Sequence, residues 1–198
     1  MKKVMLLAIA FMAGFSSYSQ SFMHGAGVAV FVDKPKNADA GAMGGLTYSP
    51  RFNFLEQDEM SVSVGVPLSV GLSGSYSANY GSYEGESNSL SFMLDVPLIV
   101  NLNLGCGSTQ ESERGFGFFV GAGFGYHYGV RNESLKDSYG YEYNGKTKSS
   151  TTGPVGNAGV RFGVGREHQH NIEVRLAYMK GLSEEKSNIF SVGCLFNF

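Results

Sequence analysis

Residues 60–73 read Met-Ser-Val-Ser-Val-Gly-Val-Pro-Leu-Ser-Val-Gly-Leu-Ser, and this stretch decides the fold. Every second residue from Met60 to Leu72 is apolar, and the residues between them are Ser, Gly or Pro. Because side chains alternate between the two faces of a β-strand, the segment predicts a strand with one apolar face and one face of small, polar groups.

The same period of two recurs along the chain. The clearest further copies are 89–104 and 115–130, and in the latter aromatic residues alternate mainly with glycine. Weaker copies occupy 24–33, 41–54, 153–165, 170–180 and 188–198. Each segment is near or above the roughly 9–11 residues of a tilted membrane-spanning strand. The sequence therefore predicts an all-β fold, an eight-stranded antiparallel up-and-down transmembrane β-barrel.

The N-terminus has the layout of an export signal. Met1-Lys2-Lys3 is followed by an apolar run over 4–15 and by small and polar residues over 16–20. This order predicts a signal peptide over 1–19, cleaved after Ser19, and a barrel domain over 20–198. The predicted strand of Cys194 does not neighbour the turn of Cys106, so we expect two unpaired thiols rather than a disulfide.

Composition indicates which face of the strands points outward. The 28 glycines disfavour helices, and the net charge of −2 offers no basic surface for nucleic acid. The face opposite the apolar one is small and poor in Lys and Glu, which suits the narrow interior of an eight-stranded barrel. Short predicted turns near 55–59, 105–114 and 166–170 alternate with connections that include the longer 74–88 and 131–152. A soluble lipocalin-like ligand-binding barrel, with the apolar face inward, is the alternative.

Five charged residues fall on the predicted inner face: Arg51, Asp95, Arg161, Glu173 and Arg175. Buried charges require partners, so we expect a salt-bridge network, for example Arg161 or Arg175 with Glu173 or Asp95. Such a polar, side-chain-filled lumen predicts a structural plug, and a narrow porin-like solute channel is the alternative. Pro67 and Pro97 also fall on this face, and we expect a local bulge at each because proline removes a ladder hydrogen bond.

Three histidines, His127, His168 and His170, are candidate catalytic or metal-binding residues. His127 points inward and is the candidate base of a lipid-acting enzyme, but the nearby Glu133 and Ser134 lie in a predicted loop without a motif. His168 and His170 are fewer than the three or four ligands of a zinc site. We therefore expect no catalysis, no metal and no cofactor.

The predicted outer loops are rich in Tyr, Ser, Gly and Asn, a composition that favours surface contact. The candidate contact residues are Tyr76, Tyr80, Tyr83, Tyr139, Tyr141 and Tyr143. Ordinary hydrophilic extensions of the strands are the simpler alternative.

The last six residues, Gly-Cys-Leu-Phe-Asn-Phe, resemble the barrel-assembly signal of outer-membrane proteins, with Gly193, Phe196 and Phe198 at the matching positions. Val-Pro-Leu at 66–68 and 96–98 resembles a strand found in one branch of these barrels. The mature chain as a whole resembles the outer-membrane β-barrel domain proteins of the small OmpA/OmpX-like, porin-superfamily type. The resemblance implies a bacterial outer-membrane location, contact with outer-membrane lipid and recognition by the assembly machinery. We expect a monomer with a structural or surface-interaction role; the resemblance supplies no molecular function.

Overall fold

A computed structural model describes residues 20–34, 40–77, 87–136, 142–165, 170–183 and 187–198, so the predicted signal peptide over 1–19 lies outside the described residues. The described part of the chain holds no helix long and apolar enough to cross a membrane. Nine β-strands follow in order: β1 (Ser21–Lys34), β2 (Gly41–Gln57), β3 (Met60–Gly65), β4 (Leu68–Ser77), β5 (Ser87–Gly105), β6 (Phe116–Lys136), β7 (Glu142–Val164), β8 (His170–Lys180) and β9 (Asn188–Asn197).

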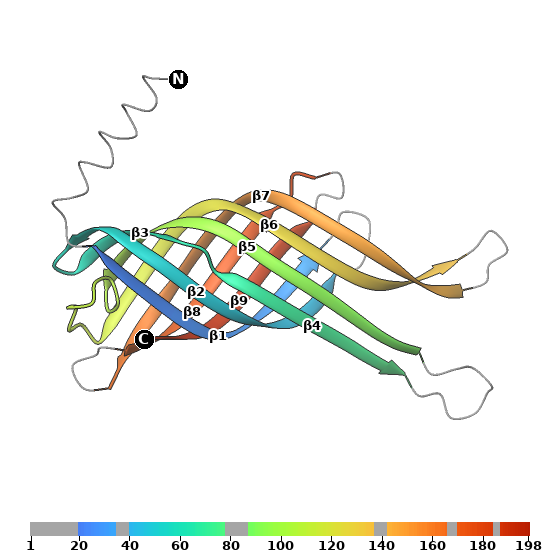
Figure 1. The fold of residues 1–198 in the computed structure, drawn as a ribbon, viewed down its shortest axis with the longest axis horizontal. Helices are drawn as coiled ribbons and strands as arrows, with labels where there is room; N and C mark the ends of the chain where they lie inside the picture. Colours follow the sequence, from blue (N-terminus) through green and yellow to red (C-terminus); the bar gives the residue numbers. More distant parts are fainter. Residues whose placement is uncertain (1–19, 35–39, 78–86, 137–141, 166–169, 184–186) are drawn as a thin grey trace, which may run out of the picture.

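The strands close into a barrel (Figure 1). Every pairing is antiparallel, and β1 pairs with both β2 and β9. β3 and β4 both lie between β2 and β5, so they act as two parts of one strand of the wall. The ring therefore has eight members, and the predicted eight-stranded up-and-down barrel is confirmed. Closure leaves no sheet edge exposed to lipid, which offers no hydrogen bonds.

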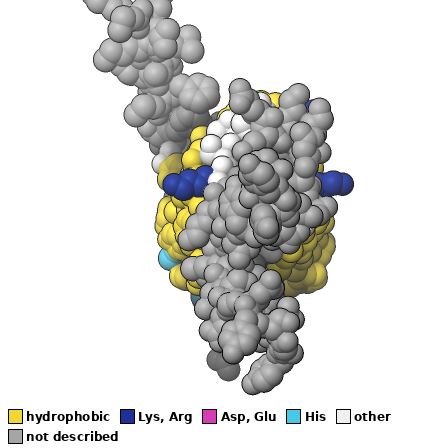
Figure 2. All heavy atoms as spheres, turned by 90° about the vertical axis from the view of Figure 1, so that its right-hand side faces the viewer, with side chains coloured by type: hydrophobic (Ala, Val, Ile, Leu, Met, Phe, Trp, Pro, Cys, Tyr) yellow, Lys and Arg dark blue, Asp and Glu magenta, His cyan; other side chains and the backbone are white. Residues whose placement is uncertain are grey.

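The apolar rows face outward. Leu46 and Leu72 are 71% and 58% exposed, whereas Arg161 and Glu173 on the opposite face are 1% and 0% exposed. Hydrophobic side chains cover the flanks of the barrel in the view from its end (Figure 2). The soluble lipocalin-like alternative is therefore wrong, because it requires the apolar rows to meet inside. Exposed aromatic side chains of the outer face include Phe116, Phe118, Phe196, Phe198, Tyr126, Tyr178 and Phe190.

Two hairpins are longer than the sequence predicts. β6 and β7 pair from Phe116 opposite Phe162 to Lys136 opposite Glu142, so most of the predicted 131–152 connection is strand. β4 likewise extends to Ser77 and β5 begins at Ser87, inside the predicted 74–88 connection. Both hairpins extend beyond the barrel at one end, here called the hairpin end, and the opposite end with the C-terminus is called the turn end (Figure 1).

The predicted bulges at the two prolines are wrong. Between the pairs Gly65–Ile99 and Ser69–Asp95 each strand contains the same number of residues, so no extra residue is inserted. The strand is instead interrupted between β3 and β4 at Pro67, while β5 continues through Pro97, which pairs with Gly125 of β6. A register shift does occur between Asn53 and Leu55 of β2.

Candidate functional site

The site begins with Glu173, a fully buried carboxylate on β8 that contacts three arginines. Arg161 of β7 donates from Nε to Glu173 Oε2 at 2.8 Å, and Arg175 Nη2 lies 2.5 Å from Oε1. Arg51 Nη1 of β2 lies 3.9 Å from Oε2, which is within ion-pair distance. Arg161 is opposite Glu173 in the β7–β8 register, so the ladder itself brings the two charges together. We call Arg51, Arg161, Glu173 and Arg175 the lumen charge cluster.

Neutral groups complete this cluster. Arg161 also donates to Asn103 Oδ1 at 3.0 Å, and Arg175 donates to Ser49 Oγ at 3.0 Å. The guanidinium carbon of Arg161 lies 4.4 Å from the centre of the Phe119 ring, and that of Arg175 lies 5.6 Å from it. Such cation–π contacts stabilise a desolvated guanidinium. Sequence reasoning missed this role of Phe119, although an aromatic residue between inward glycines was a visible signal.

The turn between β5 and β6 closes the lumen at the turn end. The Gly107 carbonyl accepts from Arg51 Nη2 at 2.7 Å and from Arg161 Nη1 at 3.3 Å. The Ser108 carbonyl accepts from Asn53 Nδ2 at 2.9 Å and from Ser61 Oγ at 2.5 Å. The sequence predicted an ordinary short turn here. The turn instead folds inward and supplies backbone acceptors to the charge cluster.

The turn carries a buried thiol. Cys106 is fully buried and Cys194 is exposed on the outer face, and both are free thiols in this structure. Burial raises the pKa of the Cys106 thiol, although Arg161 and Arg51 act in the opposite direction. The thiol is therefore neutral at neutral pH and adds no negative charge to the cluster.

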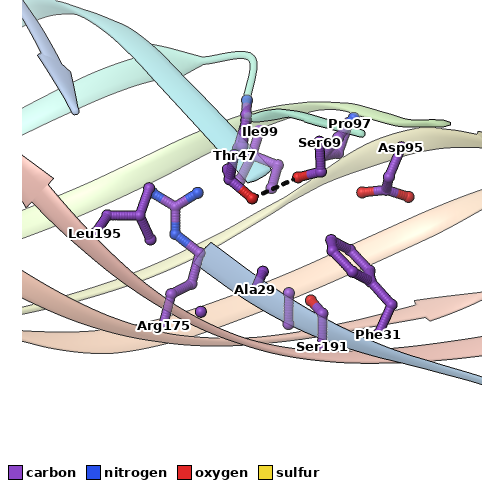
Figure 3. A pocket seen from close by; sticks show the side chains of 13 residues that line it. Ala29, Phe31, Thr47, Ser69, Asp95, Pro97, Ile99, Arg175, Ser191 and Leu195 are labelled. Atoms are coloured by element: carbon purple, nitrogen blue, oxygen red, sulfur yellow. Dashed lines mark hydrogen bonds between the residues drawn. The ribbon is translucent and has the colours of Figure 1, made fainter. Parts of the chain in front are cut away.

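Asp95 contacts a different partner. Its Oδ1 lies 3.1 Å from His127 Nδ1 across the β5–β6 ladder, and no ion pair between Asp95 and an arginine occurs among the described residues. Asp95 and Arg175 nevertheless line one small cavity of about 30 Å³ (Figure 3). In this view they lie on either side of the cavity, and the Thr47–Ser69 hydrogen bond of 2.9 Å forms part of its wall. A volume of this size suits one or two water molecules.

An apolar layer also occupies the lumen, and it corrects the prediction of a polar interior. Its members are buried side chains from six strands that point inward: Ala29, Phe31, Met43, Met93, Ile99, Val155, Met179 and Ile189. Glycines make room for the long methionines, since a Cβ at Gly71 would lie 2.6 Å from Met93 Cγ. Sequence reasoning missed this layer, although Met93 and Ile99 alternate with the outward-facing residues of β5 and so fall on its inner face. The lumen formed by the described residues is therefore part polar and part apolar.

His127 has an orienting carboxylate that the sequence did not reveal, but no nucleophile in the described part of the chain bonds to it. Its ring is 1% exposed, and Nε2 has no hydrogen-bond partner among the described residues. The side chains of Glu133 and Ser134 lie outside the described part. His168 is not described either, and the His170 ring packs on Phe196 at 5.5 Å. Over the described ranges, no group of three or more His, Cys, Asp or Glu side chains could hold a metal ion.

The remaining predicted residues are the candidate contact tyrosines and the three positions of the assembly signal. Tyr80, Tyr83, Tyr139 and Tyr141 fall outside the described residues, as do the side chains of Tyr76 and Tyr143. Phe196 of β9 and Phe198, the residue after β9, face outward at the turn end and are 43% and 50% exposed, while Gly193 of β9 faces the lumen. Their recognition by the assembly machinery stays a prediction.

No family model matches the sequence, and neither does any curated protein. Solved structures do match the fold. Ail, the attachment invasion locus protein of Yersinia pestis, superimposes with a TM-score of 0.53 at 13% identity, covering 91% of this chain and 99% of Ail. Neisserial surface protein A superimposes with a TM-score of 0.52 at 12% identity, covering 90% of this chain and 97% of that one.

The fold and the outer surface lead to one assignment. The closed ring of eight antiparallel strands is shared with these proteins, and the exposed apolar rows match a wall that faces acyl chains. This chain is a membrane-spanning eight-stranded β-barrel with the OmpA/OmpX-like fold of bacterial outer-membrane proteins.

Proposed function

We propose that the barrel is a membrane anchor whose two long hairpins, β4–β5 and β6–β7, make contacts at the cell surface. The observation that carries this proposal is the difference in ladder length around the ring. β6 and β7 stay paired as far as Lys136 and Glu142, whereas the β5–β6 ladder reaches Phe92 and Val130. Beyond that level the β6–β7 hairpin leaves the barrel wall as a two-stranded ribbon (Figure 1).

Such a ribbon is suited to binding. Strand edges present backbone N–H and C=O groups that can pair with an extended segment of a partner. The tyrosine-rich composition of the hairpins adds rigid contact area. Short turns at the opposite end support a periplasmic turn end and an extracellular hairpin end. Ail, the attachment invasion locus protein that shares the fold, was solved in complex with the heparin analogue sucrose octasulfate.

The filled lumen supports an anchor over a channel. The charge cluster and the inward turn occupy the turn end, and the apolar layer occupies the lumen toward the hairpin end. Planar-bilayer recordings test this difference: an anchor gives no conductance steps, and reproducible steps would favour the narrow-channel alternative. The proposal assigns no catalytic step, and an activity lost in His127→Ala would contradict it.

The contact role is tested by shortening the hairpin. In one variant Asn-Gly replaces residues 134–144 of β6–β7, and in a second all six candidate tyrosines become serine. Cells displaying each variant are compared with cells displaying the full chain for adhesion to heparin-coated and protein-coated surfaces. We expect adhesion to fall at least severalfold in both variants at equal surface amounts. Equal adhesion by all three chains on every surface would overturn the proposal.

A further inference from the structure

The lumen charge cluster contains more positive than negative charge. Three guanidinium groups, those of Arg51, Arg161 and Arg175, are 6%, 1% and 12% exposed. In the described chain, Glu173 is the carboxylate that lies within ion-pair distance of them. Its two oxygens already accept from Arg161, Arg175 and Asn197. A buried cation without a counter-charge is costly, so this surplus needs compensation.

The neighbouring groups compensate it only in part. The Gly107 carbonyl and the Phe119 ring are neutral, and Cys106 stays protonated at neutral pH because burial raises its pKa. Asp95 is paired with His127. Glu56 accepts from Asn53 Nδ2 at 2.8 Å and from Ser21 Oγ, near the mouth of the turn end.

Two groups beside the cluster have no hydrogen-bond partner among the described residues, although one of them, Arg51 Nη1, lies 3.9 Å from Glu173 Oε2. Arg51 Nη1 and Ser108 Oγ are both buried, and neither has a hydrogen-bond acceptor or donor among the described residues. They belong to neighbouring parts of one network, because Arg51 Nη2 donates to the carbonyl of Gly107, the residue before Ser108. Unpaired buried donors are rare in native proteins, and each calls for an explanation.

We propose that a small monovalent anion of the chloride class binds in the turn-end half of the lumen, where Arg51 Nη1 and Ser108 Oγ donate to it. The anion offsets part of the positive charge of the arginines and accepts hydrogen bonds from the two buried donors. Without an acceptor, the burial of these donors lowers the free energy of unfolding. The crowding around the turn favours a monatomic ion over phosphate, since even a Cβ at Gly107 would lie 2.6 Å from Asn171 Nδ2.

Halide-dependent unfolding of the complete barrel in detergent micelles tests this site. The urea midpoint is measured in sodium chloride, sodium bromide and sodium gluconate at one constant ionic strength. We expect chloride and bromide to raise the urea midpoint above its value in gluconate. This rise should level off as the halide concentration increases. Arg51→Gln should need at least about tenfold more chloride for the same rise, because it removes a charge-assisted donor. Arg114→Gln, at an ion pair exposed on the rim, is the matched control and should respond like the original chain.

Crystals soaked in bromide provide a readout that does not depend on how the variants fold. An anomalous peak within hydrogen-bond distance of Arg51 Nη1 and Ser108 Oγ would support the site. Ser108→Ala, which keeps all three arginines, should weaken that peak. Midpoints that do not differ between chloride and gluconate, together with no bromide peak at Arg51, would overturn the proposal.

Discussion

Pro67 and Pro97 lie at the same level of the barrel wall, on the two sides of an interruption in the β3/β4–β5 ladder. The pairs Gly65–Ile99 and Ser69–Asp95 enclose this interruption. Neither proline has an N–H to donate to the ladder. Because the two prolines lie at the same level, the ladder is interrupted at one position instead of two. The lumen cavity lies directly behind them, lined by both rings.

This arrangement predicts that the prolines are tolerated at low cost. Pro97→Ala should change the free energy of unfolding by less than about 1 kcal/mol, because a new hydrogen bond offsets the lost rigidity. Val100→Pro is the matched control, since Val100 is paired with Val64 and with Ala122. It should cost about 3 kcal/mol or more. Urea unfolding in micelles measures both, and equal effects would contradict the assignment.

Glu173 should be the most sensitive polar residue of the lumen. Glu173→Gln leaves three buried guanidiniums without their carboxylate, and removing one partner of a buried pair costs about 3–5 kcal/mol. The control is Glu59→Gln, which breaks the exposed pair with Arg114 on the rim. Surface pairs contribute roughly 0–1 kcal/mol, so this variant should stay close to the original chain in urea unfolding. If both variants lost a comparable free energy of unfolding, the lumen charge cluster would be hydrated rather than sealed from water.

The barrel could be predicted from sequence because membrane strands have a period of two and lipid leaves no tolerance for a slipped register. Rows such as Met60 to Leu72 identify the apolar face of a strand without knowledge of any partner strand, and the small, polar composition of the opposite face favours an outward apolar face. The lumen charges were visible for the same reason, and the structure brings Arg51, Arg161 and Arg175 to Glu173.

The sequence could not reveal features that depend on the register between neighbouring strands or on a turn that folds into the lumen. Pairing Asp95 with His127 requires the β5–β6 register, which a single strand pattern does not contain. The inward path of the Cys106-Gly107-Ser108 turn depends on acceptors reaching Arg51 and Asn53 from a distant part of the chain. Hairpin length was underestimated because the residues that extend the two hairpins are mostly polar or glycine and provide no apolar face to produce alternation.

Gly107 should be required for the inward turn. Its φ is +65°, a region that costs residues with a Cβ about 1–2 kcal/mol, and an added Cβ would also lie 2.6 Å from Asn171 Nδ2. Gly165 has a φ of +85° but has no atom within 4 Å of its Cβ position, so Gly165→Ala isolates the backbone term. We expect Gly107→Ala to lower the free energy of unfolding by more than Gly165→Ala does. An equal loss would show that the turn can move away from Asn171.

Cys106 should make the barrel sensitive to alkaline pH. Burial raises the pKa of its thiol in the folded chain above the value in the unfolded chain, near 8.5. Below that pH both states hold the proton and the thiol contributes no pH dependence. As the pH rises above this value, the unfolded chain loses the proton first, so the free energy of unfolding falls.

Cys106→Ser removes this titration. The difference between the two chains in urea unfolding from pH 7 to pH 10 separates the effect of the thiol from the titration of tyrosines and lysines. The original chain should lose more stability than Cys106→Ser over that range, and its thiol should react slowly with a maleimide at pH 7. Parallel pH profiles, or fast labelling of Cys106 in the folded barrel, would show that the turn opens to solvent and does not seal the lumen.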